Sequence, residues 1–382
     1  MKEESKSLFQ HLGIYSDWVA AAYQQRALFP MADPGEKTRD QLREVLGFTS
    51  GPEAPLAVQQ EGCWERDGVH GELISWSVGY GPRTQAYVLR PSGSEEPLPG
   101  VITLHDHSGF KYSGKEKIAD GPEGPASYLI PLRQSLYSGR AYANELAKEG
   151  FIVLAHDTFL WGSRRFPLED IPAPVRETAK AIQNANPLPQ DLPEEVYFYN
   201  LTSGQHEHVV EKYCNVLGTS MAGVVAYEDR VALNYLISRP DVDQSKIACL
   251  GLSGGGNRSA LLLATHSFIR AAVIVGLMST YAGMLDHNIQ THTWMLFPHG
   301  WSRYGDWSDI AASRAPMPLL VQYDLEDNLF TPEGMHAAHQ RIINHYQNTQ
   351  PQAYEGQFYP GPHKFDLEMQ SNAFHWLKTQ LS

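Results

Sequence analysis

The stretch from residue 247 to residue 262 carries residue types that could perform nucleophilic catalysis. It begins as an apolar strand, continues into a turn with a serine at its tip, and ends as a helix. The turn, Gly251-Leu252-Ser253-Gly254-Gly255, fits the G-x-S-x-G pattern of a nucleophile elbow. The flanking glycines leave room where a Cβ would collide with the facing backbone. The pattern is short, so the strand and helix around it are needed to support the interpretation.

A serine hydroxyl becomes a good nucleophile when a base lies within hydrogen-bond reach, and that base is usually a histidine held by a carboxylate. In doubly wound hydrolases the order along the chain is serine, acid, histidine. Three acids follow the predicted strand 319–323, namely Asp324, Glu326 and Asp327. We favour Asp327, because it lies a few residues into the loop at the carboxyl edge of the sheet, where such folds have their active sites. The other two acids stay open.

The histidine expected to act as the base is His363. It lies in the Gly- and Pro-containing loop 359–365, between the last predicted strand and the closing helix. Among the 16 histidines only this one has the required order and context. His375 falls inside the closing helix, where we expect a packed or surface side chain.

An oxyanion hole needs two backbone donors. One should be the N–H of Gly254, and the other should come from the turn after the strand 101–104, where His107 and Ser108 are the candidates. The triplet 105–107, His-Asp-His, also suggests a metal site. We predict no metal there, because alternate residues at a strand end point to opposite faces.

The loop 278–307 is rich in aromatic residues and histidines, and it should pass near Ser253. His287, Trp294, His299 and Trp301 are its candidates for substrate binding, although packing within the loop would explain them equally well. Arg164 and Arg165 could orient a substrate carboxylate. Pairing of these arginines with nearby acids such as Glu169 and Asp170 is the favoured alternative, and Lys115-Glu116-Lys117 is expected to be a solvated face.

Composition narrows the class of protein. The chain has 382 residues, 42% hydrophobic and 19% charged, which is typical of a globular protein. A net charge of -13 argues against nucleic acid and anionic membranes as partners. The three cysteines match neither a disulfide framework nor a metal motif. We find no signal peptide pattern and no apolar run of transmembrane length, so a cytoplasmic location is the default expectation.

The order of predicted elements favours an α/β fold with a mostly parallel, doubly wound sheet. Alternating residues at 71–78 and 84–90 predict a β-hairpin or meander, and short apolar strands then alternate with helices. Residues 1–60 should form an N-terminal helical extension ending in a polar linker, which could mediate a homodimer. Residues 61–382 should form the main domain, with a Pro- and Asn-rich insertion at 160–215 that could act as a lid.

Taken together, these motifs resemble the bacterial α/β-hydrolases of the dienelactone hydrolase and acetyl xylan esterase-like group. The resemblance extends from about residue 65 to the C-terminus. It rests on Leu104–Gly109 with Gly114–Lys117, on His156-Asp157 leading to Trp161–Arg165, on residues 229–243 leading to the elbow, on Gly305–Trp307 leading to Ala315–Val321, on Asp327–Phe330 and on Gly361–Phe365. It implies Ser253 as nucleophile, Asp327 as acid and His363 as base. Dienelactone hydrolases in the strict sense use a cysteine nucleophile, so Ser253 weakens the expectation of a lactone substrate.

The first hypothesis is therefore hydrolysis of a small carboxylic ester, with an acetyl or other short acyl group, without a cofactor or metal. The second is a hydrolase-like binding protein without activity, and the third is a lactone or carbon–carbon bond hydrolase using the same three residues. The intact serine, acid and histidine argue against the second hypothesis.

Overall fold

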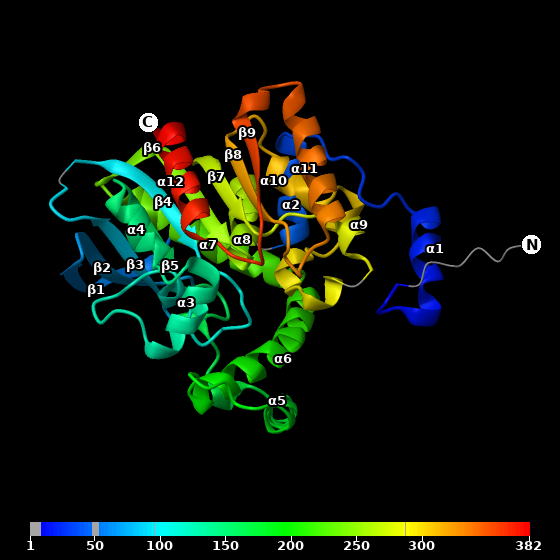
Figure 1. The fold of residues 1–382 in the computed structure, drawn as a ribbon, viewed down its shortest axis with the longest axis horizontal. Coiled ribbons are helices and arrows are strands. Elements are labelled where there is room, and N and C mark those ends of the chain that lie inside the picture. Colours follow the sequence, from blue (N-terminus) through cyan, green and yellow to red (C-terminus); the bar gives the residue numbers. More distant parts are fainter. Residues whose placement is uncertain (1–8, 48–52, 95, 287) are drawn as a thin grey trace, which may run out of the picture.

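The protein was examined as a computed structural model, which describes residues 9–47, 53–94, 96–286 and 288–382 (Figure 1). In these residues nine strands form one sheet in the order β1-β2-β3-β5-β4-β6-β7-β8-β9. Strands β1 to β3 and the β3–β5 pair are antiparallel, and every pair from β5 to β9 is parallel. The strands are β1 (Leu56–Arg66), β2 (Val69–Ser77), β3 (Thr84–Pro91), β4 (Leu98–Leu104), β5 (Ile152–His156), β6 (Val242–Leu252), β7 (Ile269–Val275), β8 (Leu319–Asp324) and β9 (Tyr354–Tyr359).

Helices cover both faces of the sheet, as the predicted doubly wound fold requires. Helices α4 and α12 pack on one face, and α7, α8, α10 and α11 lie on the other. The α-helices are α1 (Asp17–Gln25), α2 (Glu36–Leu46), α3 (Ile130–Tyr137), α4 (Tyr142–Lys148), α5 (Ala173–Ala185), α6 (Glu194–Val216), α7 (Met221–Ser238), α8 (Gly254–Thr265), α9 (Tyr281–Met284), α10 (Trp307–Ala312), α11 (Pro332–Gln347) and α12 (Leu367–Leu381). The predicted fold class is confirmed.

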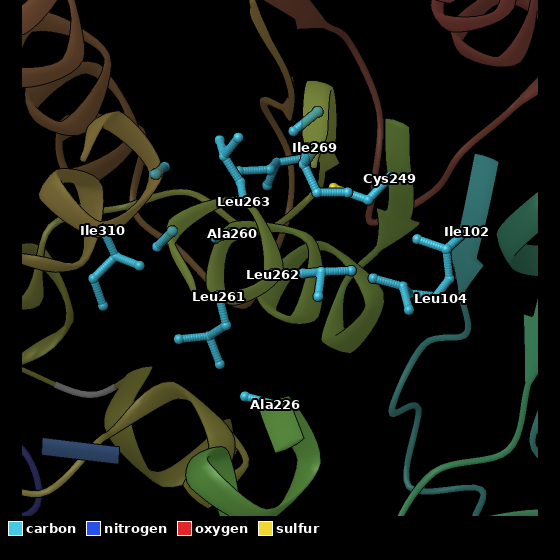
Figure 2. Close-up of a cluster of buried hydrophobic side chains, with 14 of the residues drawn as sticks. Ile102, Leu104, Ala226, Cys249, Ala260, Leu261, Leu262, Leu263, Ile269 and Ile310 are labelled. Atoms are coloured by element: carbon cyan, nitrogen blue, oxygen red, sulfur yellow. The ribbon is translucent and has the colours of Figure 1, made fainter. Parts of the chain in front are cut away.

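Strand β6 shows how the sheet divides the core. Successive strand residues point to opposite faces, so Cys249 packs with α8 while Ala248 and Leu250 pack with α4 and α12. Figure 2 shows the first of these layers, with Leu261 and Leu262 of α8 between the sheet and the neighbouring helices. Because both layers are apolar and fully buried, β6 and α8 form a rigid support for the turn between them.

Three details of the predicted organisation differ in the structure. Strand β1 begins at Leu56, so the predicted boundary at residue 60 falls inside a strand whose residues are mostly exposed at the sheet edge. The helix expected over 216–238 begins at Met221, because Gly218 with φ +77° ends α6. The insertion at 160–215 forms α5 and α6, which extend below the sheet in Figure 1. A lid role for it stays a prediction.

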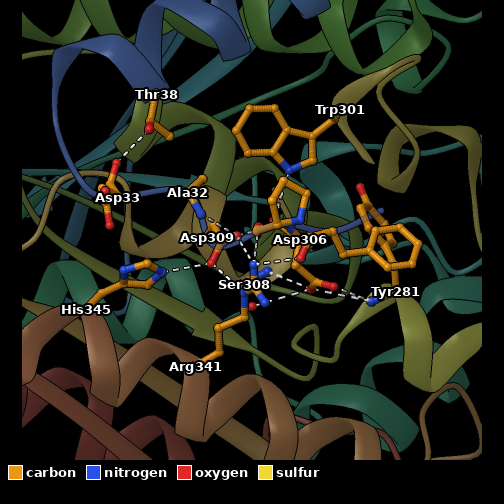
Figure 3. Close-up of polar contacts among 12 residues, drawn as sticks. Ala32, Asp33, Thr38, Tyr281, Trp301, Asp306, Ser308, Asp309, Arg341 and His345 are labelled. Atoms are coloured by element: carbon orange, nitrogen blue, oxygen red, sulfur yellow. Dashed lines mark hydrogen bonds and ion pairs between the residues drawn. The ribbon is translucent and has the colours of Figure 1, made fainter. Parts of the chain in front are cut away.

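The N-terminal segment is joined to the main body by buried polar contacts (Figure 3). Asp309 Oδ2 accepts the N–H of Ala32 at 3.3 Å, and Arg341 links Asp309 to the carbonyl of Phe29. Helix α1 itself buries no side chain in the described structure. The homodimer contact through these helices stays a prediction. No helix in the described part of the chain is long and apolar enough to cross a membrane.

Candidate active site

Ser253 occupies the turn between β6 and α8 with φ 58° and ψ -122°, a conformation that non-glycine residues rarely adopt. The neighbouring glycines permit this turn. A Cβ on Gly251 would lie 2.4 Å from the carbonyl carbon of Gly255, and one on Gly255 would lie 1.9 Å from the oxygen of Leu104. The N–H of Ser253 donates to the oxygen of Val275 at 2.9 Å. The serine is therefore held at the carboxyl edge of the parallel strands.

The predicted acid and base lie together at the same edge. His363 Nδ1 is 2.6 Å from Asp327 Oδ2, and Asp327 also accepts the N–H of Leu329 at 2.8 Å. His363 Nε2 is buried without a hydrogen-bond partner in the described structure. Burial lowers the pKa of His363, but the hydrogen bond and charge of Asp327 outweigh it, so the net pKa is raised. Such a histidine can accept a proton through Nε2.

A pocket of about 270 Å³ joins these groups. Its walls include Ser253, His363 and Gly254, together with His107 and Ser108 from the turn after β4. The structure thus brings the predicted nucleophile, base and oxyanion turn to one cavity, with the predicted acid behind the base.

The turn after β4 lies directly against the elbow. A Cβ on Gly254 would be 2.7 Å from the backbone nitrogen of His107, which makes His107 the better placed of the two predicted donors. No hydrogen bond in the described structure uses the N–H of His107 or Gly254. Lys117, fully buried, donates to the carbonyls of Asp106 and His107 and pairs with the Asp106 carboxylate. These contacts hold the turn in place and leave the N–H of His107 available to a substrate oxygen.

Of the four residues predicted for substrate binding, the three that the structure describes do not line this pocket. Trp301 is completely buried, and its Nε1 donates to the Asp306 carbonyl at 2.9 Å, so its expected role is replaced by core packing. Trp294 and His299 line a separate pocket of about 280 Å³. His287 lies outside the described residues. The loop does pass near Ser253, as predicted, but Trp294, His299 and Trp301 lie outside the pocket that contains the serine.

The same loop reaches the pocket through Thr291, His292 and Thr293. Burial lowers the pKa of His292 to about 4, and its Nε2 lies 2.9 Å from the Leu329 carbonyl oxygen. A neutral His292 therefore donates to that carbonyl and forms a fixed wall. Nothing in the spacing of the loop distinguishes these residues from their neighbours.

Helix α6 contributes Glu207 behind the pocket. Glu207 contacts His107 Nε2 at 2.9 Å and Thr293 Oγ1 at 2.8 Å, and it forms an ion pair with the buried Lys111. Burial raises the pKa of Glu207, but the charges of Lys111 and His107 hold it well below its ordinary value. Sequence reasoning missed this residue because α6 lies a hundred positions from the turn that it supports.

Lys115 and Lys117, predicted to lie in a solvated face, are buried instead. Lys115 pairs with Asp157 at 2.9 Å, which places it under the sheet edge. Arg164 pairs with Glu228 at 2.5 Å, and Arg165 stacks on Tyr112, so neither arginine pairs with the predicted acids or faces the pocket of Ser253. Helix α7 and loops distant in the sequence supply these partners, and local spacing could not reveal them.

Asp324, the second candidate for the acid, also lies beside the base. Carboxylate oxygens of Asp324 and Asp327 and a ring nitrogen of His363 lie within 4.8 Å of one another. This is the one group of at least three such side chains in the described structure that could surround a metal ion. The 2.6 Å contact between His363 and Asp327 is a hydrogen bond, so a metal ion bound to both side chains would have to replace it.

Comparisons with known proteins agree with this architecture. The sequence profile of the prolyl oligopeptidase family matches residues 212–381, which include the elbow, Asp327 and His363. The Bacillus subtilis protein named "putative hydrolase YtaP" is 25% identical over 304 residues, covering 78% of this chain and 83% of that protein.

Solved structures with the same fold are more distant in sequence. A protein of Bacteroides fragilis described as a putative acetyl xylan esterase superposes with a TM-score of 0.65 at 18% identity, covering 91% of this chain and 82% of that one. A glucuronoyl esterase from Solibacter usitatus superposes with a TM-score of 0.61 at 13% identity, covering 90% and 92%. With the sheet order and the family match, these findings show that the chain belongs to the α/β-hydrolase superfamily and is an enzyme of the hydrolase class.

Proposed function

We propose that the protein hydrolyses small carboxylic esters through an acyl-enzyme formed on Ser253. The observation that carries this proposal is the hydrogen bond between His363 and Asp327, with the other ring nitrogen of His363 buried and unpartnered in the described structure. Ser253 lines the same pocket as His363. A serine at a strained elbow, a base held by an acid and an unused backbone N–H are the parts that acyl transfer requires.

In the proposed reaction Ser253 Oγ attacks the acyl carbon while its proton passes to His363 Nε2. The oxyanion accepts hydrogen bonds from the N–H groups of Gly254 and His107. Collapse of this intermediate expels the alcohol, which takes the proton from Nε2. Water then attacks the acyl-enzyme with the same base, releasing the acid and the free serine. In the resting state Asp327 accepts the proton of His363 Nδ1, so that Nε2 is unprotonated. Asp327 also stabilises the imidazolium that forms during the reaction.

The size of the pocket supports a small acyl group. At about 270 Å³ it lies at the lower end of ordinary ligand pockets. Its apolar walls come from Leu136, Leu277 and Leu329, and no lysine or arginine lines it. The proteins of similar fold that are described as a putative acetyl xylan esterase and a glucuronoyl esterase support an ester over an amide. The family match favours peptide hydrolysis as the second candidate.

The test is turnover of a nitrophenyl ester series by the wild type and by Ser253→Ala. We expect hydrolysis of acetate and butyrate, a steep decline at octanoate, and loss of at least about a thousandfold in Ser253→Ala. Glu326→Gln, which changes an exposed carboxylate in the loop of Asp327, is the matched control. Undiminished turnover by Ser253→Ala would refute the proposal.

Substrates separate the remaining candidates. Cleavage of a prolyl nitroanilide in preference to the esters would favour the peptidase. Cleavage of a lactone or a diketone in preference to the esters would favour the corresponding lactone or carbon–carbon bond hydrolase. Failure of a fluorophosphonate to label Ser253 would favour a binding protein without activity.

A further inference from the structure

Asp324 is a buried carboxyl that the proposed reaction does not use. It ends β8, and its side chain is almost completely enclosed. Its Oδ2 accepts the backbone N–H of Lys364 at 3.0 Å, and its Oδ1 has no hydrogen-bond partner in the described structure. A buried carboxylate oxygen without a partner is costly for folding, so its presence beside the active site suggests a function.

The carboxyl faces the ring of His363. An ideal Cβ built on Gly276 would lie 3.0 Å from His363 Cε1 and 3.1 Å from Asp324 Oδ2, so the ring carbon and the carboxylate oxygen both lie beside the same glycine. Asp327 contacts the ring through Nδ1. His363 thus has one acid at Nδ1 and a second acid within 4.8 Å of a ring nitrogen.

The charges around this pair are few. Asp324 interacts with His363, with the carboxylate of Asp327 and with the ammonium of Lys364. His363 interacts with Asp327, Asp324 and, more weakly, Asp106, and it faces His292 across the pocket. Lys364 Nζ is paired with Asp366 at 2.7 Å, at a partly exposed position. The charge of Asp324 therefore interacts mainly with the imidazole of His363.

We propose that Asp324 is a positioning residue for His363. Asp324 holds the loop of His363 through the Lys364 N–H, and it stabilises the imidazolium as Ser253 attacks. This inference rests on the proposed function. An anion near the ring favours the protonated imidazole, and that form appears only when the proton has left the serine. The stabilisation therefore lowers the barrier of the chemical step and leaves substrate binding unchanged.

Protonation of Asp324 switches this contribution off near neutral pH. Burial raises the pKa of Asp324 to about 7, with the charge of Asp327 adding to the rise and the Lys364 N–H and His363 opposing it. Above this value the carboxylate is ionised and supports the imidazolium. Below it Asp324 is neutral while some His363 is still available as a base. Because the two groups interact, the observed pKa values belong to the pair.

The experiment compares the pH profiles of kcat and KM for the wild type and Asp324→Asn. The amide keeps an acceptor for the Lys364 N–H but carries no charge. We expect kcat of the variant to be about tenfold lower at pH 9, since a nearby charge shifts a pKa by about one unit or more. The difference should shrink toward none at pH 5.5, with KM unchanged. A ratio that is constant with pH, or a change confined to KM, would overturn the inference.

Two further measurements keep the result interpretable. Glu326→Gln is the control, because it removes an exposed charge from the same loop and should reproduce the wild-type profile. The wild-type acid limb of kcat/KM should require two ionisations, and a fit by one ionisation would refute the inference even if Asp324→Asn fails to fold. If Ser253→Ala stays active, the proposed function fails. If Ser253→Ala is inactive but Asp324→Asn behaves as the wild type, the proposed function stands and the role of Asp324 is refuted.

Discussion

Glu207 Oε2 lies 2.9 Å from His107 Nε2 and joins helix α6 to the turn that borders the elbow. His107 Nδ1 accepts the N–H of Gly109 at 3.0 Å, so the ring proton is on Nε2 and is donated to Glu207. The other oxygen of Glu207 accepts from Thr293, which also lines the pocket. One carboxylate from the insertion therefore holds the turn after β4 and the loop of Thr293 together.

Glu207→Gln should weaken both folding and catalysis. It leaves the ammonium of Lys111, which is 1% exposed, without its anion, and breaking a buried ion pair in this way costs about 3 kcal/mol. The substitution also removes a contact that holds the turn carrying the His107 N–H, and this should lower kcat by about tenfold or more. Denaturant unfolding measures the first effect and ester turnover the second.

Glu194→Gln provides the control for this variant. Glu194 lies on the same helix and is largely exposed, and its ion pair with Lys180 is long, at 3.6 Å. Loss of its charge should therefore change the free energy of unfolding by less than about 0.5 kcal/mol. A Glu207→Gln enzyme that is less stable but keeps its wild-type kcat would assign Glu207 to folding alone.

The placement of Ser253, Asp327 and His363 at one edge of the sheet could be predicted from the sequence because local rules determine it. A strand, a glycine-flanked serine and a helix form one continuous segment, and the order of acid and histidine follows from the parallel strands that carry them. Asp327 and His363 lie 36 positions apart, yet both follow neighbouring strands of the sheet. The topology brings the ends of β8 and β9 to the same edge.

The pocket walls could not be predicted in the same way. Whether Trp301 or His292 faces the serine depends on how an irregular loop packs. The buried charges Lys117 and Glu207 depend on partners from distant elements. Residues that look like a solvated charge cluster become internal ion pairs only when the fold supplies those partners.

Gly276→Ala should displace the base, and its Cβ would lie equally close, at 3.0 Å, to Leu252 Cδ1 beside the nucleophile. Gly276 has φ +55°, and an added Cβ would lie 3.0 Å from His363 Cε1, closer than a normal contact. Because a misplacement of about 1 Å can cost a hundredfold, a smaller displacement of the ring should lower kcat/KM by about tenfold or more. Steady-state kinetics with a short nitrophenyl ester measure this loss.

The control for this substitution is Gly204→Ala in α6. An added Cβ there meets nothing within 4 Å, and an alanine stabilises a helix by about 1 kcal/mol relative to glycine. Its kcat/KM should equal that of the wild type. Equal activity of Gly276→Ala and the wild type would mean that His363 tolerates the added methyl group and that its placement does not depend on this glycine.

Asp306 should make the stability of the protein depend on pH. It begins α10 as the capping residue and accepts the N–H of Tyr281 at 3.1 Å (Figure 3). Burial raises its pKa to about 6, with Arg341 opposing and Asp309 adding to the rise. Because the folded pKa lies above the unfolded value, the neutral acid stabilises the fold below about pH 4, and this stabilisation is lost as the pH rises through 6.

Asp306→Asn isolates this effect, because asparagine caps a helix as well as aspartate but does not ionise. Relative to the wild type, the variant should gain up to about 3 kcal/mol in unfolding free energy between pH 4 and pH 8. Urea unfolding at both pH values measures the change. Asp309→Asn, which removes the partner of Arg341 and His345, should instead destabilise the protein at both. A difference between Asp306→Asn and the wild type that is equal at pH 4 and pH 8 would show that Asp306 is ionised across this range.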